Sequence, residues 1–197
     1  MAPGTVPAPY GLRFDTGRIC LDLLATRHPD ERLGSVAVLR AWITGCGLVP
    51  PGTPLDHVGP SWLTAFRELR ADLDPLISAT LSREAPPYDL PLARVNAAAR
   101  TAPPAPRARR GRDGTLVRAL DGPPERAALL GAVARDAVEL LTDPVARADL
   151  RQCAGDRCPV VYLDTSRGRR RRWCSSEVCG NRERAARHRR RATPPRT

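Results

Sequence analysis

The sequence predicts a mainly α-helical protein with a minor β component, an α+β chain that has one helical domain and one small C-terminal module. Three observations support this class. Apolar residues recur at helical spacing through most of residues 12–150. One Arg-Asp-Gly turn, at residues 112–114, separates two short extended runs and indicates a β-hairpin. Four of the six cysteines lie in two pairs within the last 45 residues or so.

The first helices are located by their apolar faces and their end signals. Residues 17–27 place four apolar side chains on one helical face, which predicts the first helix. A second helix is expected over Ser35–Cys46, with its serine as the N-cap. Ser61 is expected to cap a third helix. Asp74-Pro75 has the composition of an N-cap followed by proline in the first turn, so we expect a separate short helix to begin there.

Further elements complete the helical domain. Asp89 is expected to begin another helix, which a proline cluster ends before the β-hairpin. Apolar positions at helical spacing then predict a long helix over Pro123–Thr142. Asp143-Pro144 repeats the cap-plus-proline pattern and predicts a last short helix that ends near Leu150.

The positive charge is concentrated behind residue 150. Residues 151–197 contain fourteen arginines and four acidic residues, a net +10 of the total +11, whereas residues 1–150 contain eighteen arginines and seventeen acidic residues. This shift sets the domain boundary. The expected division is a flexible tail over 1–11, a helical domain over 12–150, a basic module over 151–191 and a disordered tail over 192–197. Such asymmetry favours a polyanionic partner, either nucleic acid or an anionic membrane surface.

The membrane alternative has no further support in the sequence. The first residues lack the basic and apolar regions of a secretory signal, and no apolar run approaches the roughly 18 residues of a membrane span. We therefore expect a cytoplasmic protein without membrane contact, whose thiols stay reduced.

The basic module contains Cys153, Cys158, Cys174 and Cys179, two C-x4-C pairs that fifteen residues separate. Two such pairs supply the four soft ligands of a tetrahedral Zn²⁺ site. Disulfides within each pair and a redox dithiol are the alternatives. A reducing compartment disfavours the first, and redox dithiols usually have two residues between their cysteines. The spacing thus predicts a structural zinc ion, and four cysteines leave no open position for catalysis.

The module is expected to fold as a small treble-clef or ribbon-like zinc finger. The strand-like residues 160–164 and the returning segment before Cys174 should form a hairpin that brings the pairs together, and a helix should follow Cys179. Its apolar core is limited to Val160, Tyr162 and Trp173. Metal binding, on the order of 10–16 kcal/mol in finger peptides, would supply the missing stability. The neighbouring arginines should lower the thiol pKa values.

Residues 171–191, RRWCSSEVCGNRERAARHRRR, closely resemble the CGNR zinc finger, which is named for the tetrapeptide at Cys179–Arg182. Upstream, ICLDLLATR and LRAWITGCGL are similar to the ABATE domain, which is described as a stress-induced transcription regulator. The resemblance implies that the four cysteines bind zinc and that the finger binds DNA.

The candidate nucleic-acid contacts lie on both sides of the second cysteine pair. Most arginines should contact phosphates, whereas Asn181 is a residue type that reads adenine. The structural alternative is that Asn181 caps the helix and that Gly180 permits a tight turn, and we favour the cap. The full candidate set is Arg169, Arg170, Arg171, Arg172, Asn181, Arg182, Arg184, Arg187, Arg189, Arg190 and Arg191.

Three functional hypotheses follow. The first is a nucleoid-associated regulator of transcription that binds duplex DNA, whose N-terminal domain senses a small-molecule effector or forms a homodimer. The second is an RNA-binding or ribosome-associated zinc protein. The third is an enzyme in the N-terminal domain around Asp22. We expect no enzyme, since the sequence offers no Ser-His-Asp set, phosphate loop or carboxylate pair.

Overall fold

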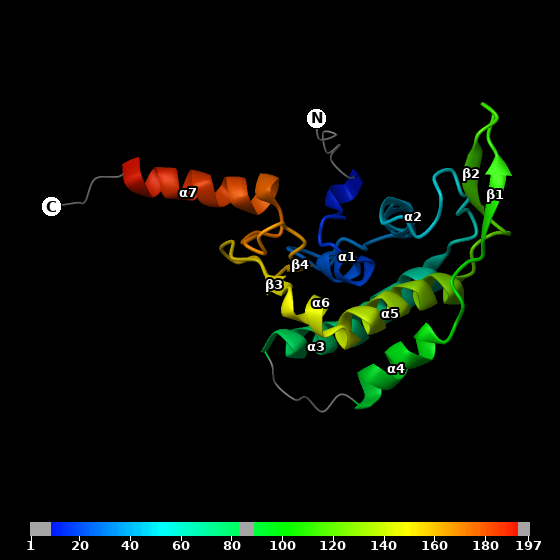
Figure 1. Cartoon of the computed structure of the whole chain (residues 1–197), viewed down its shortest axis with the longest axis horizontal. Coiled ribbons are helices and arrows are strands. Elements are labelled where there is room, and N and C mark those ends of the chain that lie inside the picture. The colour runs from blue at the N-terminus through cyan, green and yellow to red at the C-terminus, as the bar shows by residue number, and fades with distance from the viewer. Residues whose placement is uncertain (1–8, 83–88, 193–197) are drawn as a thin grey trace.

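The computed structural model describes residues 9–82 and 89–192 and has a helical body with a small metal-finger module (Figure 1). The two expected terminal tails fall mostly outside these ranges and stay predictions. The body contains a short 3₁₀ turn η1 (Pro9–Gly11), helices α1 (Ile19–Ala25), α2 (Val36–Gly45), α3 (Pro60–Ser82) and α4 (Asp89–Ala99), strands β1 (Pro106–Arg110) and β2 (Leu116–Leu120), and helices α5 (Arg126–Thr142) and α6 (Pro144–Ala148).

The C-terminal module contains two further strands and a terminal helix. They are β3 (Leu150–Gln152), β4 (Val161–Leu163), a π-helical turn η2 (Ser176–Gly180) and α7 (Asn181–Ala192). The chain is therefore mainly helical with two small antiparallel β-hairpins, which confirms the predicted fold class. No helix in the described part of the chain combines the length and the apolar character needed to cross a membrane.

The body core lies where α1, α2, α3 and α5 meet. Each helix buries one apolar stripe, as on α3, where Trp62, Phe66 and Leu69 point inward. Trp42 of α2 meets Phe66 edge to face, with ring centroids 5.7 Å apart. Ser35 caps α2 as expected, because its side chain accepts a hydrogen bond from the Val38 N–H.

Two predicted helix boundaries are wrong, and both concern α3. Helix α3 continues through Pro75 instead of ending before it, and it begins at Pro60 instead of behind Ser61. A proline inside a helix costs about 3 kcal/mol. Leu73, Leu76 and Ile77 stay in phase with the stripe on both sides of this proline and are buried. Since burying each such side chain stabilises by about 1.5–3 kcal/mol, the continuous helix is favoured.

The β1–β2 hairpin confirms the predicted turn. Arg110 pairs with Leu116, and the five-residue loop between them is closed by the Gly111 N–H, which donates to the Thr115 carbonyl at 2.7 Å. Gly114 has φ +82°, which is a conformation that glycine adopts without strain. All five residues of β1 are exposed, and the hairpin projects from one end of the molecule (Figure 1).

The second hairpin differs from the predicted one. Strand β4 pairs with β3, in front of the first cysteine, and not with the segment before Cys174. The first cysteine loop itself reverses the chain, as the Cys153 N–H donates to the Val160 carbonyl at 3.0 Å. Loop closure does not explain the difference, because a return from β4 to the segment before Cys174 would need a loop about as long as the eight residues that separate β3 from β4. The later segment joins through one bond, from the Ala154 N–H to the Arg172 carbonyl.

The finger packs against the body and shares a core with it. The Leu163 N–H donates to the Thr16 carbonyl at 2.7 Å, and Ala25 of α1 joins the buried cluster around Tyr162. Gly17 has φ +92°, and a Cβ there would lie 3.2 Å from the Leu163 Cβ. The finger core expected from Val160, Tyr162 and Trp173 is thus completed by the body. Its tryptophan is only partly buried.

Candidate metal centre and nucleic-acid interface

Four cysteine sulfurs converge where the two halves of the finger meet. One half is the β3–β4 hairpin, and the other is the segment that leads through η2 into α7. The Sγ atoms of Cys153, Cys158, Cys174 and Cys179 all lie within 4.8 Å of one another. Three of the Sγ–Sγ distances are 3.5, 3.6 and 3.7 Å. A tetrahedron with Zn–S bonds of about 2.3 Å has edges of about 3.8 Å, so the donor set fits zinc in both chemistry and size.

Each half of the finger supplies two sulfurs. Cys153 follows β3 and Cys158 lies in the loop before β4, whereas Cys179 lies in η2, directly before α7. Gly155 lets the first loop approach the second, because a Cβ there would lie 3.3 Å from the Cys179 Cβ and 3.4 Å from the Cys153 Sγ. A side chain at this position would be tightly packed against the cysteines, so the position favours glycine, and sequence spacing did not reveal this.

The thiols differ in how readily they ionise. Burial raises the pKa of Cys158 to about 11, and burial also raises the pKa of Cys174, although Arg13 acts in the opposite direction there. Burial opposes ionisation of Cys153 as well. The N–H groups of Cys174 and Gly155, which donate to its Sγ at 3.3 and 3.4 Å, nevertheless keep the pKa of this thiol below its usual value. The expectation that neighbouring arginines lower these pKa values is wrong for Cys158 and Cys174, since burial outweighs them.

A side chain from the N-terminal segment reaches the metal site. The guanidinium of Arg13 donates to the Cys174 Sγ and to the Cys174 carbonyl, each at 2.9 Å. Asp15 holds the same guanidinium at 2.9 Å, and only 17% of the Arg13 side chain is exposed. Sequence reasoning missed this residue because the contact spans 161 positions and no local pattern marks it.

The CGNR tetrapeptide supports the site and the start of α7. Arg182 donates to the Cys179 Sγ at 3.4 Å and to the Asp156 carbonyl at 3.5 Å, so it links the two halves of the finger. Gly180 is buried beneath Arg184, whose Nη1 would lie 3.3 Å from a Cβ. Arg184 also donates to the Asn181 Oδ1 at 2.5 Å.

Asn181 is not the helix cap that we favoured. Ser175 performs that role, as its Oγ accepts a hydrogen bond from the Val178 N–H at 3.2 Å. Because the π-helical turn already begins at Ser176, Asn181 has helical angles, φ −65° and ψ −44°. Its side chain is exposed and holds Arg184 instead.

Three of the four arginines before Cys174 contact residues of the finger or of the body. Arg171 lies over the Tyr162 ring, 4.5 Å from its centroid, and donates to the carbonyls of Asp15, Trp173 and Cys174. Arg169 pairs with Asp149, and Arg172 lies over the Trp173 ring at 5.5 Å. Arg170 is exposed, and its guanidinium has no partner among the residues that the structure describes.

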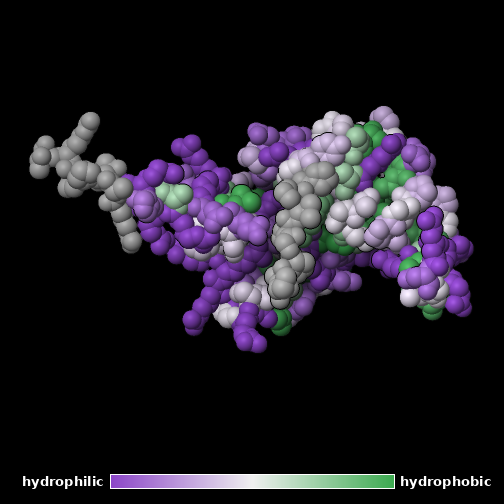
Figure 2. All heavy atoms as spheres, turned by 90° about the horizontal axis from the view of Figure 1, so that it is seen from above, coloured by the Kyte–Doolittle hydropathy of each residue, from purple (hydrophilic) through white to green (hydrophobic). Residues whose placement is uncertain are grey.

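Helix α7 leaves the finger and extends away from the body (Figure 1). Its surface is hydrophilic on the face that Figure 2 shows. Within residues 9–82 and 89–192, neither the Arg187 side chain nor the Arg190 side chain makes a hydrogen bond or an ion pair, and both are exposed. The Arg191 side chain lies outside the described part. The exposed arginines of the helix are Arg182, Arg184, Arg187, Arg189 and Arg190.

Asp22, the centre of the enzyme hypothesis, is buried in α1. Its Oδ1 accepts hydrogen bonds from the Thr16 N–H at 3.2 Å and the Thr16 hydroxyl at 2.7 Å. Burial raises the pKa of this carboxyl to about 7. These contacts join α1 to the segment that carries Arg13. Asp22 is not among the residues that line the cleft described below.

Comparison with protein-family models matches both parts of the chain. Residues 17–144 match the ABATE model, described as "Putative stress-induced transcription regulator", and residues 150–192 match the CGNR zinc finger. The order of the two confirms the resemblance seen in the sequence. No curated protein matches the chain.

Proposed function

The chain belongs to the ABATE family and ends in a CGNR zinc finger, and from this premise we propose that it is a transcription regulator that binds duplex DNA through α7. The observation that carries the proposal is an arginine-rich helix that extends freely from a four-cysteine metal site. The proposal assigns no reaction to the chain.

The structural role of the metal is to fix the direction of α7. We propose that the ion is zinc, held by the four cysteines. When bound, it supplies the positive charge that keeps these thiols ionised. Around it, Arg13 and Arg182 donate to two of the sulfurs, and Ser175 caps the turn that leads into α7. The helix direction is thus set by the metal site and by its contacts to the body.

Helix α7 has dimensions that suit a DNA groove. Its twelve residues span about 18 Å, and the major groove of B-DNA, about 12 Å wide, admits one α-helix. The helix has six arginines and one glutamate, so its own charges repel one another until a polyanion neutralises them. Arg170, Arg187 and Arg190 are the best placed phosphate contacts, because their guanidinium groups are not engaged elsewhere in the described structure.

The N-terminal domain would regulate this binding by sensing a small molecule or by forming a homodimer. A single finger of this size offers little interface for affinity, which supports a dimer with two fingers on one duplex. Sizing of the protein at several concentrations tests this part, and a strictly monomeric species at DNA-binding concentrations contradicts it.

The test of DNA binding uses the full zinc-loaded chain and fluorescence anisotropy of a labelled duplex at several salt concentrations. The variant Arg187→Gln/Arg190→Gln should bind more weakly and should reduce the salt slope by about 2, since each phosphate contact contributes about 0.9. The matched control is Arg27→Gln/Arg94→Gln, which removes the same charge from exposed ion pairs on the body.

Two outcomes overturn the proposal. Equal losses in both variants show that net charge alone attracts the duplex. Preferential displacement of the duplex by a structured RNA of the same length assigns the helix to RNA instead.

A further inference from the structure

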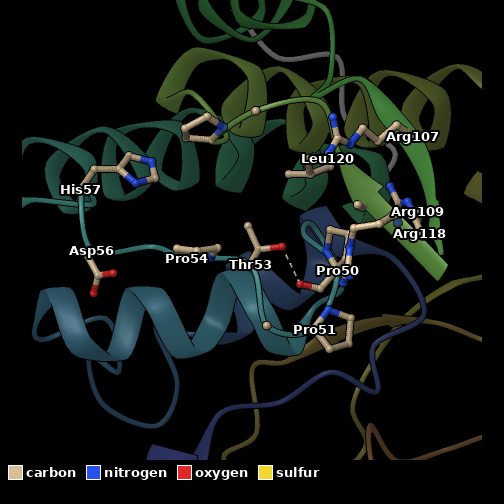
Figure 3. A pocket seen from close by; sticks show the side chains of 14 residues that line it. Pro50, Pro51, Thr53, Pro54, Asp56, His57, Arg107, Arg109, Arg118 and Leu120 are labelled. Carbon is tan, nitrogen blue, oxygen red and sulfur yellow. Dashed lines mark hydrogen bonds between the residues drawn. The ribbon is translucent and has the colours of Figure 1, made fainter. Parts of the chain in front are cut away.

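A cleft of about 710 Å³ lies in the body, between the Pro50–His57 loop, the β1–β2 hairpin and the turn at Gly122-Pro123 (Figure 3). In Figure 1 the hairpin and α7 occupy opposite ends of the long axis of the molecule. The cleft is therefore separate from the proposed DNA-binding surface. Its volume falls within the roughly 300–1,000 Å³ that small-molecule sites occupy.

Rigid residues form the walls of the cleft. Proline rings line it from two segments, the Pro50–His57 loop and the turn at Pro123, and Leu120 adds an apolar side chain. The Thr53 hydroxyl donates to the Pro50 carbonyl at 2.7 Å and closes the loop (Figure 3). At the other end the His57 Nε2 donates to the Pro124 carbonyl at 2.9 Å, and its ring meets Trp62 edge to face. The cleft is thus preformed in shape.

Three arginines of the hairpin gather at one end of the cleft. Figure 3 shows Arg107, Arg109 and Arg118 at one end of the cleft and Asp56 and His57 at the opposite end. The guanidinium of Arg107 lies 3.4 Å from Asp121, in an exposed pair.

The charge of these arginines is not balanced inside the cleft. Neither the Arg109 side chain nor the Arg118 side chain has a hydrogen bond or ion pair with any residue of the described ranges. Asp56 is the one acidic residue that lines the cleft, so its lining carries a net charge of +2. Like charges that gather in one cleft without a counter-ion repel each other, and an anion bound there relieves this repulsion.

We propose that this cleft binds a small anionic molecule, with two or more phosphate or carboxylate groups on the arginines and an apolar part against the prolines and Leu120. The inference names the ligand class of the sensing role proposed above. Duplex DNA fits the cleft less well than a small molecule. The Pro50–His57 loop and the hairpin both line the cleft, and a duplex, whose major groove alone is about 12 Å wide, is too large to enter between them.

The test is isothermal titration calorimetry of the full zinc-loaded chain, without DNA. The probes are ADP, inorganic pyrophosphate and citrate at constant ionic strength. ADP and pyrophosphate report phosphate recognition, and citrate reports carboxylate recognition. We expect saturable binding of at least one probe, with Arg109→Gln/Arg118→Gln roughly tenfold weaker or more.

The matched control is Arg110→Gln/Arg112→Gln, which removes the same charge from the same hairpin but outside the cleft. Binding within about twofold of the parent is expected, because an exposed charge at this distance is screened. Thermal melting of both variants checks that the hairpin change leaves the fold intact.

Three results overturn the inference. They are no saturable heat with any of the probes, equal losses in the two hairpin variants, or a loss of duplex affinity in the cleft variant as large as that of Arg187→Gln/Arg190→Gln. The last would identify the hairpin as a second duplex contact. Because the calorimetry contains no DNA, its failure is distinguishable from a failure of the proposed DNA binding.

Discussion

Replacing Arg13 by glutamine should weaken metal binding, although this residue lies 140 positions before the first cysteine of the site. The substitution removes a cation that donates to the Cys174 Sγ and carbonyl, each at 2.9 Å. It also removes the tie between the N-terminal segment and the finger. The Cys174 thiol then keeps only the influences that raise its pKa, which are burial and the neighbouring Cys153 and Cys158.

The magnitude can be worked out in two ways. Hydrogen bonds to charged groups contribute about 1.5–3 kcal/mol, and Arg13 is only 17% exposed, so solvent screens them little. The pair with Asp15 adds less, since that carboxylate is 46% exposed. Independently, loss of a group that holds a metal ligand costs about 10–100-fold in affinity, or about 1.4–2.8 kcal/mol. Both routes give roughly 2 kcal/mol, a zinc affinity lower by about 30-fold.

The assay is competition for zinc between the full chain and a chromophoric chelator at neutral pH. Arg13→Lys should be intermediate, because its ammonium retains the charge but cannot bridge Sγ and the carbonyl as the guanidinium does. Arg27→Gln is the control, since it breaks an ion pair whose two side chains are 58% and 47% exposed. A zinc affinity of Arg13→Gln within twofold of the parent would refute the reasoning.

Three further predictions concern the metal loops and α1. Gly155→Ala should lower zinc affinity, because its Cβ would lie 3.3 Å from the Cys179 Cβ, whereas Gly59→Ala, which has open space, should not; equal zinc affinity of the two variants in the competition assay contradicts this. Removing the metal with a strong chelator should abolish duplex binding and reduce the helical circular dichroism signal, and an unchanged spectrum argues against a structural metal. Asp22 has a folded pKa of about 7 against an ordinary 3.8, so the folded state binds more protons between these values. The free energy of unfolding should therefore fall by roughly 4 kcal/mol at most as pH rises from about 4 to about 7, and it should stay level above pH 7. Asp22→Asn should remove this pH dependence. Urea unfolding of parent and variant across pH measures the slope, and parallel curves contradict the assignment.

The sequence was most informative where a local pattern determines the structure. The apolar stripes located α2, α3 and α5, and the Arg-Asp-Gly turn located the β1–β2 hairpin. Local rules failed at Pro75, where the proline signal was real but burial of the continuing stripe outweighed it. They also failed at β3, because its three residues form a strand only through their pairing with β4.

The same distinction applies to the site. Cysteine spacing predicted all four sulfur ligands, because the chemistry of a tetrahedral site constrains residue type and spacing together. The groups that hold those sulfurs depend on tertiary contacts. No local sequence pattern marks the roles of Arg13 and Gly155. The roles of Asn181 and Arg182 depend on the π-helical turn, which places both residues inside a helix.

The contacts of Arg13 also bear on how the two domains could influence each other. The short segment from Arg13 to Thr16 makes three contacts. Arg13 donates to the Cys174 Sγ, the Thr16 carbonyl accepts from the Leu163 N–H of β4, and the Thr16 hydroxyl donates to Asp22. Any change that moves α1 therefore alters the donors around the metal site that sets the direction of α7. If the N-terminal domain binds a ligand and α7 binds DNA as proposed, thermodynamic linkage requires that each change the affinity for the other by the same factor. A rigid finger on a flexible tether would have no such coupling, and the hydrogen bonds at Thr16 and Arg13 are what distinguish this chain from that arrangement.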